Sequence, residues 1–105
     1  DAWFGRTSQP YQHVAHAVFR CVENCVGMVR ATNTGLSCFI DPFGRVYGVL
    51  RNAAGEDLYV EGAEARDLPL TRTSTFYTRH GNIFAAGCAA ASAGLFAAGC
   101  LRRRR

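Results

Sequence analysis

The chain has 105 residues, of which 49% are hydrophobic and 19% charged, a composition that argues for one small folded domain and against intrinsic disorder. It has 12 basic residues, all of them arginines, and 8 acidic residues. The four arginines Arg102–Arg105 account for the net charge of +4, because the other residues carry 8 positive and 8 negative charges. This pattern is unlike the spread basic face of a nucleic-acid-binding protein. The absence of lysine excludes any mechanism that needs a lysine from these residues.

Residues 1–27 predict a loop followed by one helix. The opening sequence DAWFG has neither the charged nor the apolar region of a signal peptide, and we expect the chain to be a fragment or a processed piece. After Pro10, apolar residues recur at helical spacing over residues 11–25, which indicates a helix with one buried stripe. Gly27 is expected to stop this helix.

The next part of the sequence predicts short strands separated by turns. Four strands are expected, at residues 28–32, 37–40, 45–50 and 58–60. Turn-forming residue types lie between them at 33–35, 41–44 and 52–55, the second with the Asp-Pro-x-Gly pattern of a type I turn. One helix with about four strands is less than a complete core, so the order of elements predicts the last part of a larger α/β sandwich.

Residues 83–101 contain no charge and predict a transmembrane helix. A helix of this length is about 28 Å long, close to the ~30 Å hydrocarbon core of a bilayer. Its many Ala and Gly residues would let other transmembrane helices approach closely. By the positive-inside rule, Arg102–Arg105 lie in the cytoplasm and residues 1–82 on the outer side. A buried helix of a soluble protein is the alternative, but such a helix normally has a polar stripe, and this one has only Ser92.

Cysteine and histidine residues suggest metal sites that their spacing does not support. Cys21 and Cys25 lie four residues apart on the predicted helix, but no second pair follows at zinc-like spacing. His13 and His16 lack the His-Glu-x-x-His pattern of a metal-binding helix. We therefore expect structural roles for these residues and no metal site.

Several motifs occur in an order that resembles one protein family. They are DAWFG at 1–5, PYQH at 10–13, RCVEN at 20–24, RATNTG at 30–35 and IDPFGR at 40–45. Together they closely resemble the C-terminal third of bacterial apolipoprotein N-acyltransferases, and TFYTRHGN at 75–82 resembles the family's link to its last transmembrane helix. The resemblance implies the end of a nitrilase-like (carbon–nitrogen hydrolase) α/β sandwich at 1–82, a transmembrane helix at 83–101 and a cytoplasmic tail at 102–105. It also implies the bacterial inner membrane, with residues 1–82 on the periplasmic side.

The resemblance implies an enzyme that takes an acyl chain from a phospholipid onto a cysteine as a thioester. The acyl chain then passes to the amino group of a lipidated N-terminal cysteine of a lipoprotein. A glutamate acts as general base, and a lysine helps to stabilise the oxyanion. In the family these three residues lie upstream of the segment that begins at Asp1. We therefore expect no catalytic residue and no cofactor here, and no activity from the isolated chain. The implied partners are the phospholipid donor, the lipoprotein acceptor, the membrane and other helices of a longer parent protein, but no nucleic acid.

Eight residues are candidates for lining the pocket of the parent enzyme. They lie in the opening motif, at the start of the helix, and in the strand and turn that follow it. The set is Trp3, Phe4, Gly5, His13, Arg30, Thr32, Asn33 and Thr34. Packing of Trp3 and Phe4 in a core, and plain turn formation by the Asn-Thr-Gly sequence, remain open alternatives.

Two other functional hypotheses remain open. One is a carbon–nitrogen hydrolase, an amidase or nitrilase, that acts on a small amide. The other is a small membrane-anchored binding module without chemistry. The uncharged span with its arginine tail argues against a soluble hydrolase, and the ordered family motifs argue against the module.

Overall fold

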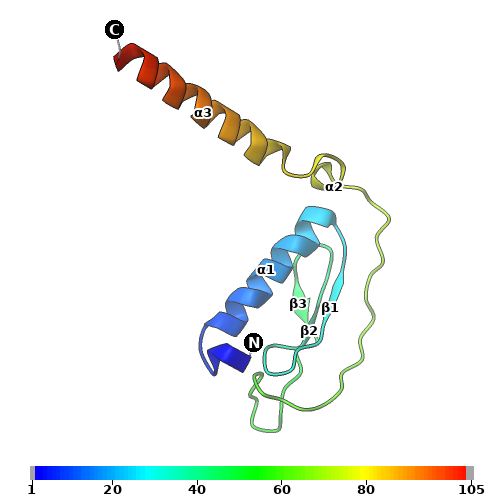
Figure 1. Ribbon diagram of the computed structural model, residues 1–105. Helices are drawn as coiled ribbons and strands as arrows, with labels where there is room; N and C mark the ends of the chain where they lie inside the picture. The colour runs from blue at the N-terminus through cyan, green and yellow to red at the C-terminus, as the bar shows by residue number, and fades with distance from the viewer. Residues whose placement is uncertain (1, 104–105) are drawn as a thin grey trace. The chain divides into compact units, whose positions relative to one another are not determined.

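The computed structural model describes residues 2–103, which divide by their contacts into the units Asp1–Thr75 and Phe76–Arg105 (Figure 1). The first unit contains a short 3-10 helix, one α-helix and three strands. They are η1 (Ala2–Phe4), α1 (Gln9–Asn24), β1 (Met28–Arg30), β2 (Cys38–Ile40) and β3 (Val46–Tyr47). The second unit contains α2 (Phe76–His80) and α3 (Ile83–Arg103). Helices with a small antiparallel sheet place the chain in the α/β class.

The three strands form one antiparallel sheet in the order β1-β2-β3 (Figure 1). Met28 pairs with Ile40, so their side chains share one face of the sheet, and α1 packs on this face. Val29 pairs with Phe39, and Phe39 pairs with Tyr47, so these three side chains share the opposite face. The sheet is therefore covered by a helix on one side only.

The core lies between α1 and the sheet. Its buried members are Val14, Ala17, Cys21, Leu36, Cys38, Ile40 and Leu58. The three from α1 are spaced by three or four residues, as the helical stripe predicted from the sequence requires. Ile40 lies at the centre with no exposed surface.

The predicted helix is confirmed, with its ends shifted. It begins at Gln9 because Pro10 fits the first helical turn. It ends before Gly27 because Cys25 adopts the left-handed conformation, with φ 52°. The N–H groups of Cys25 and the next residue donate to the carbonyl oxygens of Val22 and Cys21, which closes the helix with a Schellman motif.

The strand predicted at residues 58–60 is wrong, so the sheet has three strands rather than about four. Tyr59 has a φ of 58°, a left-handed conformation that is incompatible with a β-strand. Its N–H donates instead to the carbonyl oxygen of Thr34 at 3.0 Å. The strand predicted at 45–50 is shortened to Val46–Tyr47, because Gly48 also turns left-handed, with φ 54°.

Two of the predicted turns are confirmed by their hydrogen bonds. The N–H of Gly44 donates to the carbonyl oxygen of Asp41 at 3.0 Å, and that of Gly55 donates to Asn52 at 2.9 Å. Glycine is required at 44 because its φ is 85° and because a Cβ there would lie 2.8 Å from Cγ2 of Val22. The turn therefore packs directly against Val18 and Val22 of α1.

The second unit is dominated by α3. Its segment Ile83–Cys100 is long and apolar enough to cross a membrane, and it is the one such helix within residues 2–103. Its described side chains are exposed all around the helix, including Phe84, Leu95 and Phe96. An apolar surface without a polar stripe fits a lipid environment, so α3 agrees with the helix predicted at residues 83–101.

The left-handed Cys25 generates a stability prediction. Cys25→Gly removes the steric cost of a Cβ at this conformation, and we expect it to stabilise the end of α1 by about 1 kcal/mol. The Val26 amide should then exchange with solvent about fivefold more slowly in the full chain in detergent micelles. Cys25→Ala is the matched control, since it removes the thiol but keeps the Cβ. Equal exchange rates in all three proteins would contradict the assignment of strain to this position.

Candidate functional site

A pocket of about 650 Å³ opens beside the sheet. β1 and the turn after it provide one side, with Arg30, Thr32 and Asn33. The extended segment after residue 58 provides the other side, including Tyr59 and Glu61. Apolar side chains lie between these polar groups: Val29, Phe39, Leu50 and Val60. The pocket therefore offers an apolar surface together with several hydrogen-bond donors.

Three of the eight predicted pocket residues, Arg30, Thr32 and Asn33, line this pocket. Ser37 holds the turn beneath them, because its Oγ accepts the N–H of Thr32 at 3.1 Å and lies 3.2 Å from the Thr32 hydroxyl. Thr34 lies just outside, and its buried Oγ1 has no hydrogen-bond partner among the described residues.

The other four predicted residues lie at the beginning of the chain and do not line this pocket. Trp3 is 96% exposed, so it has no core role in this structure. Phe4 contacts His13 edge to face, with ring centroids 5.4 Å apart. Gly5 has a φ of 57°, which lets the chain turn between η1 and the start of α1. Of these four residues, Phe4 and His13 are therefore in contact with each other, and Trp3 is almost fully exposed.

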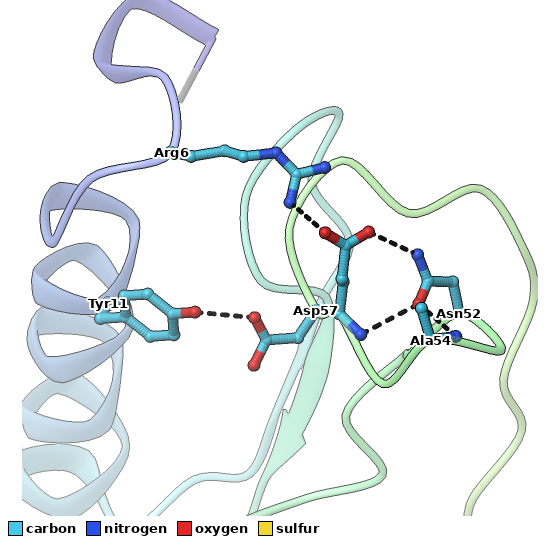
Figure 2. Close-up of polar contacts among 6 residues, drawn as sticks. Arg6, Tyr11, Asn52, Ala54 and Asp57 are labelled. Carbon is cyan, nitrogen blue, oxygen red and sulfur yellow. Dashed lines mark hydrogen bonds and ion pairs between the residues drawn. The ribbon is translucent and has the colours of Figure 1, made fainter.

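A polar network that sequence analysis missed connects the start of the chain to the turn at 52–55 (Figure 2). The Arg6 guanidinium lies 2.8 Å from one carboxylate oxygen of Glu56, and the Asn52 amide donates to the other at 2.8 Å. Arg6 also lies over the ring of Tyr59, 5.4 Å from its centroid. Through Arg6, the network therefore contacts Tyr59, a residue that lines the pocket. Arg6 and Glu56 are 50 residues apart, and no sequence pattern indicates such a pairing.

A second contact joins α1 to the same segment, since the Tyr11 hydroxyl donates to Oδ1 of Asp57 at 2.7 Å (Figure 2). This hydrogen bond raises the pKa of Tyr11 above 10.0, with smaller contributions from desolvation and from the charge of Asp57. Removing the phenol proton would place two negative charges side by side.

The two buried cysteines, Cys21 and Cys38, are not activated as nucleophiles. Burial raises the pKa of Cys21 and of Cys38 above the ordinary value of 9.0, so both thiols stay protonated at neutral pH. Asp41 adds to the effect at Cys21, whereas Arg30 partly offsets it at Cys38. Within residues 2–103, no three His, Cys, Asp or Glu side chains gather as a metal site would require.

The Tyr11–Asp57 contact generates a pH prediction. Because the folded-state pKa of Tyr11 is raised, the contact stabilises the fold below pH 10.0, and this contribution disappears as the pH rises through the raised value. Asp57→Asn should lower the pKa of Tyr11, as followed by tyrosinate absorbance with Tyr11→Phe as the reference. Glu56→Gln is the control, because the Glu56 carboxylate forms no hydrogen bond with Tyr11. Its loss should therefore leave the pKa of Tyr11 unchanged. A Tyr11 titration that Asp57→Asn does not change would contradict the assigned cause.

Comparison with known proteins finds relatives that share one name, although no protein-family model matches the chain. The apolipoprotein N-acyltransferase of Geobacter metallireducens is 43% identical over 93 residues, which are 89% of this chain and 17% of the relative. The Rhodopseudomonas palustris protein of the same name is 43% identical over 82% of the chain and 15% of its own length. The one from Chlorobaculum tepidum is 33% identical over 99% of the chain and 18% of its own length. The chain thus spans less than a fifth of these relatives, and it is homologous, over most of its length, to one segment of the apolipoprotein N-acyltransferases.

Proposed function

We propose that the chain is the C-terminal part of a membrane apolipoprotein N-acyltransferase. In this proposal residues 1–82 end a nitrilase-like domain, 83–101 form the last transmembrane helix and 102–105 are a cytoplasmic tail. The observation that carries it is the similarity to enzymes of this name over 82–99% of the chain. The sheet supports it further, because its face away from α1 is open at Val29, which is 59% exposed, although Phe39 on the same face is buried. A second layer of a sandwich would cover that face.

The proposed reaction has two acyl transfers. A cysteine thiolate attacks the ester carbonyl of a phospholipid and releases a lysophospholipid, which leaves an acyl thioester. The free amino group of a lipidated N-terminal cysteine then attacks the thioester, and the thiolate leaves. The nucleophile, the glutamate base and the lysine belong to the parent protein outside these 105 residues. Two features support this division: the chain has no lysine, and its Cys21 and Cys38 thiols are buried and protonated.

The chain's proposed contribution to the site is one wall of the pocket. Arg30, Thr32 and Asn33 carry hydrogen-bond donors that suit a phospholipid ester or headgroup oxygen. Val29 and Phe39 offer the apolar surface that an acyl chain needs. The exposed Trp3 and its neighbours are proposed to meet the acyl chain or the missing part of the domain at the rim.

A chimaera tests the proposal. We would replace the matching segment of the Geobacter metallireducens enzyme by this chain and measure acyl transfer to a lipopeptide in proteoliposomes. The chimaera should transfer acyl groups, whereas the isolated chain should not. Arg30→Ala should lower kcat/KM about tenfold or more, because a charged hydrogen-bond donor is lost from the pocket.

The control for this experiment is Arg51→Ala, since Arg51 is exposed and lies outside the pocket. Its kcat/KM should equal that of the unmodified chimaera. A chimaera that inserts into the membrane and transfers nothing would favour the non-catalytic module instead.

Membrane orientation has its own test. With green fluorescent protein fused after Arg105 of the chimaera, we expect fluorescence, because the positive-inside rule places this end in the cytoplasm. Alkaline phosphatase at the same position should be inactive. Replacing Arg102–Arg105 by glutamine should weaken this preference, whereas Arg51→Gln should not affect it. An active phosphatase on the unmodified tail would refute the proposed sidedness.

A further inference from the structure

The far wall of the pocket begins at a residue in a strained conformation. Tyr59 has a φ of 58°, and it is the first of six consecutive pocket-lining residues, 59–64. A left-handed conformation disfavours any residue with a Cβ, so contacts elsewhere in the fold have to hold it. The residue types at 58–60 favour an extended strand, which is the local alternative. The direction in which the wall leaves Tyr59 therefore depends on the contacts of this residue.

The backbone around Tyr59 is fixed by three contacts within the first unit. Tyr11 donates to Oδ1 of Asp57 at 2.7 Å, and Leu58 belongs to the buried core. The N–H of Tyr59 donates to the carbonyl oxygen of Thr34 at 3.0 Å. None of these three contacts involves the Tyr59 ring, which belongs to a residue that is 42% exposed.

Arg6 contacts the Tyr59 ring. Its guanidinium lies over the ring, 5.4 Å from the centroid, where the ring quadrupole attracts a cation. Arg6 is itself held, because it lies 2.8 Å from one carboxylate oxygen of Glu56 (Figure 2). Asn52 donates to the other oxygen at 2.8 Å and accepts the Glu56 N–H at 2.9 Å. Arg6 therefore joins a well-bonded turn to the ring of Tyr59.

The ion pair between Arg6 and Glu56 does not by itself explain this arrangement. The two side chains are 55% and 47% exposed, and exposed ion pairs of this kind contribute little to stability. The arginine has a second partner, however, in the ring of Tyr59. A small bias in free energy is enough to select one of two local backbone conformations.

We propose that Arg6 is a positioning residue of the pocket. It holds the Tyr59 ring, keeps Tyr59 left-handed and thereby sets where the wall at 59–64 lies opposite β1. Without Arg6, Tyr59 extends more often and the wall moves. The consequence for lipid binding rests on the proposed function, in which this pocket takes the phospholipid donor, whereas the coupling of Arg6 to Tyr59 does not depend on acyl transfer.

Amide hydrogen exchange of the full chain in detergent micelles tests the positioning role. The reporter is the Tyr59 N–H, which its bond to Thr34 protects. In Arg6→Ala this amide should exchange about threefold faster or more, because the wall opens locally more often. The amides of β2 should keep their protection, which distinguishes local opening from general unfolding. Arg6→Lys should exchange more slowly than Arg6→Ala, because an ammonium group still attracts both the ring and Glu56.

Arg20→Ala is the matched control. Arg20 is also an arginine paired with a glutamate, its side chain is 58% exposed, and it does not line the pocket. This variant should leave the exchange of the Tyr59 amide unchanged. Equal exchange of that amide in Arg6→Ala and in the unmodified chain would overturn the proposal.

A double-mutant cycle separates a role through Tyr59 from a role in the ion pair alone. Tyr59→Leu removes the ring, so adding Arg6→Ala in this background should have no further effect on the amide at position 59. If Arg6→Ala speeds exchange equally in both backgrounds, Arg6 acts through Glu56 alone and the proposal fails.

Kinetics of the chimaera test the consequence for the pocket. Arg6→Ala should raise the KM for the phospholipid donor about threefold and leave kcat nearly unchanged, because the wall contacts bound lipid rather than the reacting atoms. Faster exchange of the Tyr59 amide with an unchanged KM would overturn the role of Arg6 in the pocket. An unmodified chimaera that transfers nothing would refute the proposed acyl transfer, and the exchange of the Tyr59 amide would still decide the positioning role.

Discussion

The packing of α1 on a single face of the sheet is the contact on which the first unit depends. Ile40 is completely buried in the core cluster to which Cys21 of the helix also belongs, and burial of such a side chain contributes roughly 2–3 kcal/mol. This contact fixes β2, and pairing with β2 fixes both other strands. The same arrangement leaves Val29 exposed on the other face. Phe39 on that face is nevertheless buried, so the face is open only in part.

The pocket depends on a different kind of contact. The segment after β3 belongs to no strand, and side-chain bonds to backbone atoms hold it in place. The Tyr47 hydroxyl donates to the carbonyl oxygen of Asp67 at 2.8 Å, and the hydroxyls of Thr71 and Thr75 donate to the end of α1. These contacts hold the segment between Asp67 and Thr75, which follows the far wall of the pocket, against the first unit. A single segment thus connects the proposed lipid pocket with the proposed membrane anchor.

Sequence patterns predicted the features that depend on local chemistry. The buried stripe of α1, the turn that begins at Asp41 and the uncharged segment of α3 each have a periodicity or a set of residue types that identifies them. The failed strand at 58–60 has strand-like residues, but a contact with Thr34 places Tyr59 in a left-handed conformation. Tertiary contacts of this kind override local propensity.

The candidate site, too, could be predicted from sequence only where local motifs identify its residues. Motif resemblance identifies Arg30, Thr32 and Asn33, and they line a pocket because they lie at the end of β1 and in the turn directly after it. The network of Arg6 with Glu56 was not predicted, because partners 50 residues apart leave no local pattern. Charged pairs of this kind become visible only when the folded chain brings them together.

In the proposed enzyme, these residues contribute one pocket wall and one membrane helix, and the reactive groups lie in other parts of a longer protein. The most direct measurement is to sequence the DNA immediately upstream of the Asp1 codon. We expect an in-frame Asn codon directly before Asp1 and, further upstream, a Cys-Tyr-Glu-like nucleophile segment, a lysine, a glutamate and several apolar spans. A start codon close to Asp1, with none of these elements before it, would contradict the enzymatic assignment for this chain.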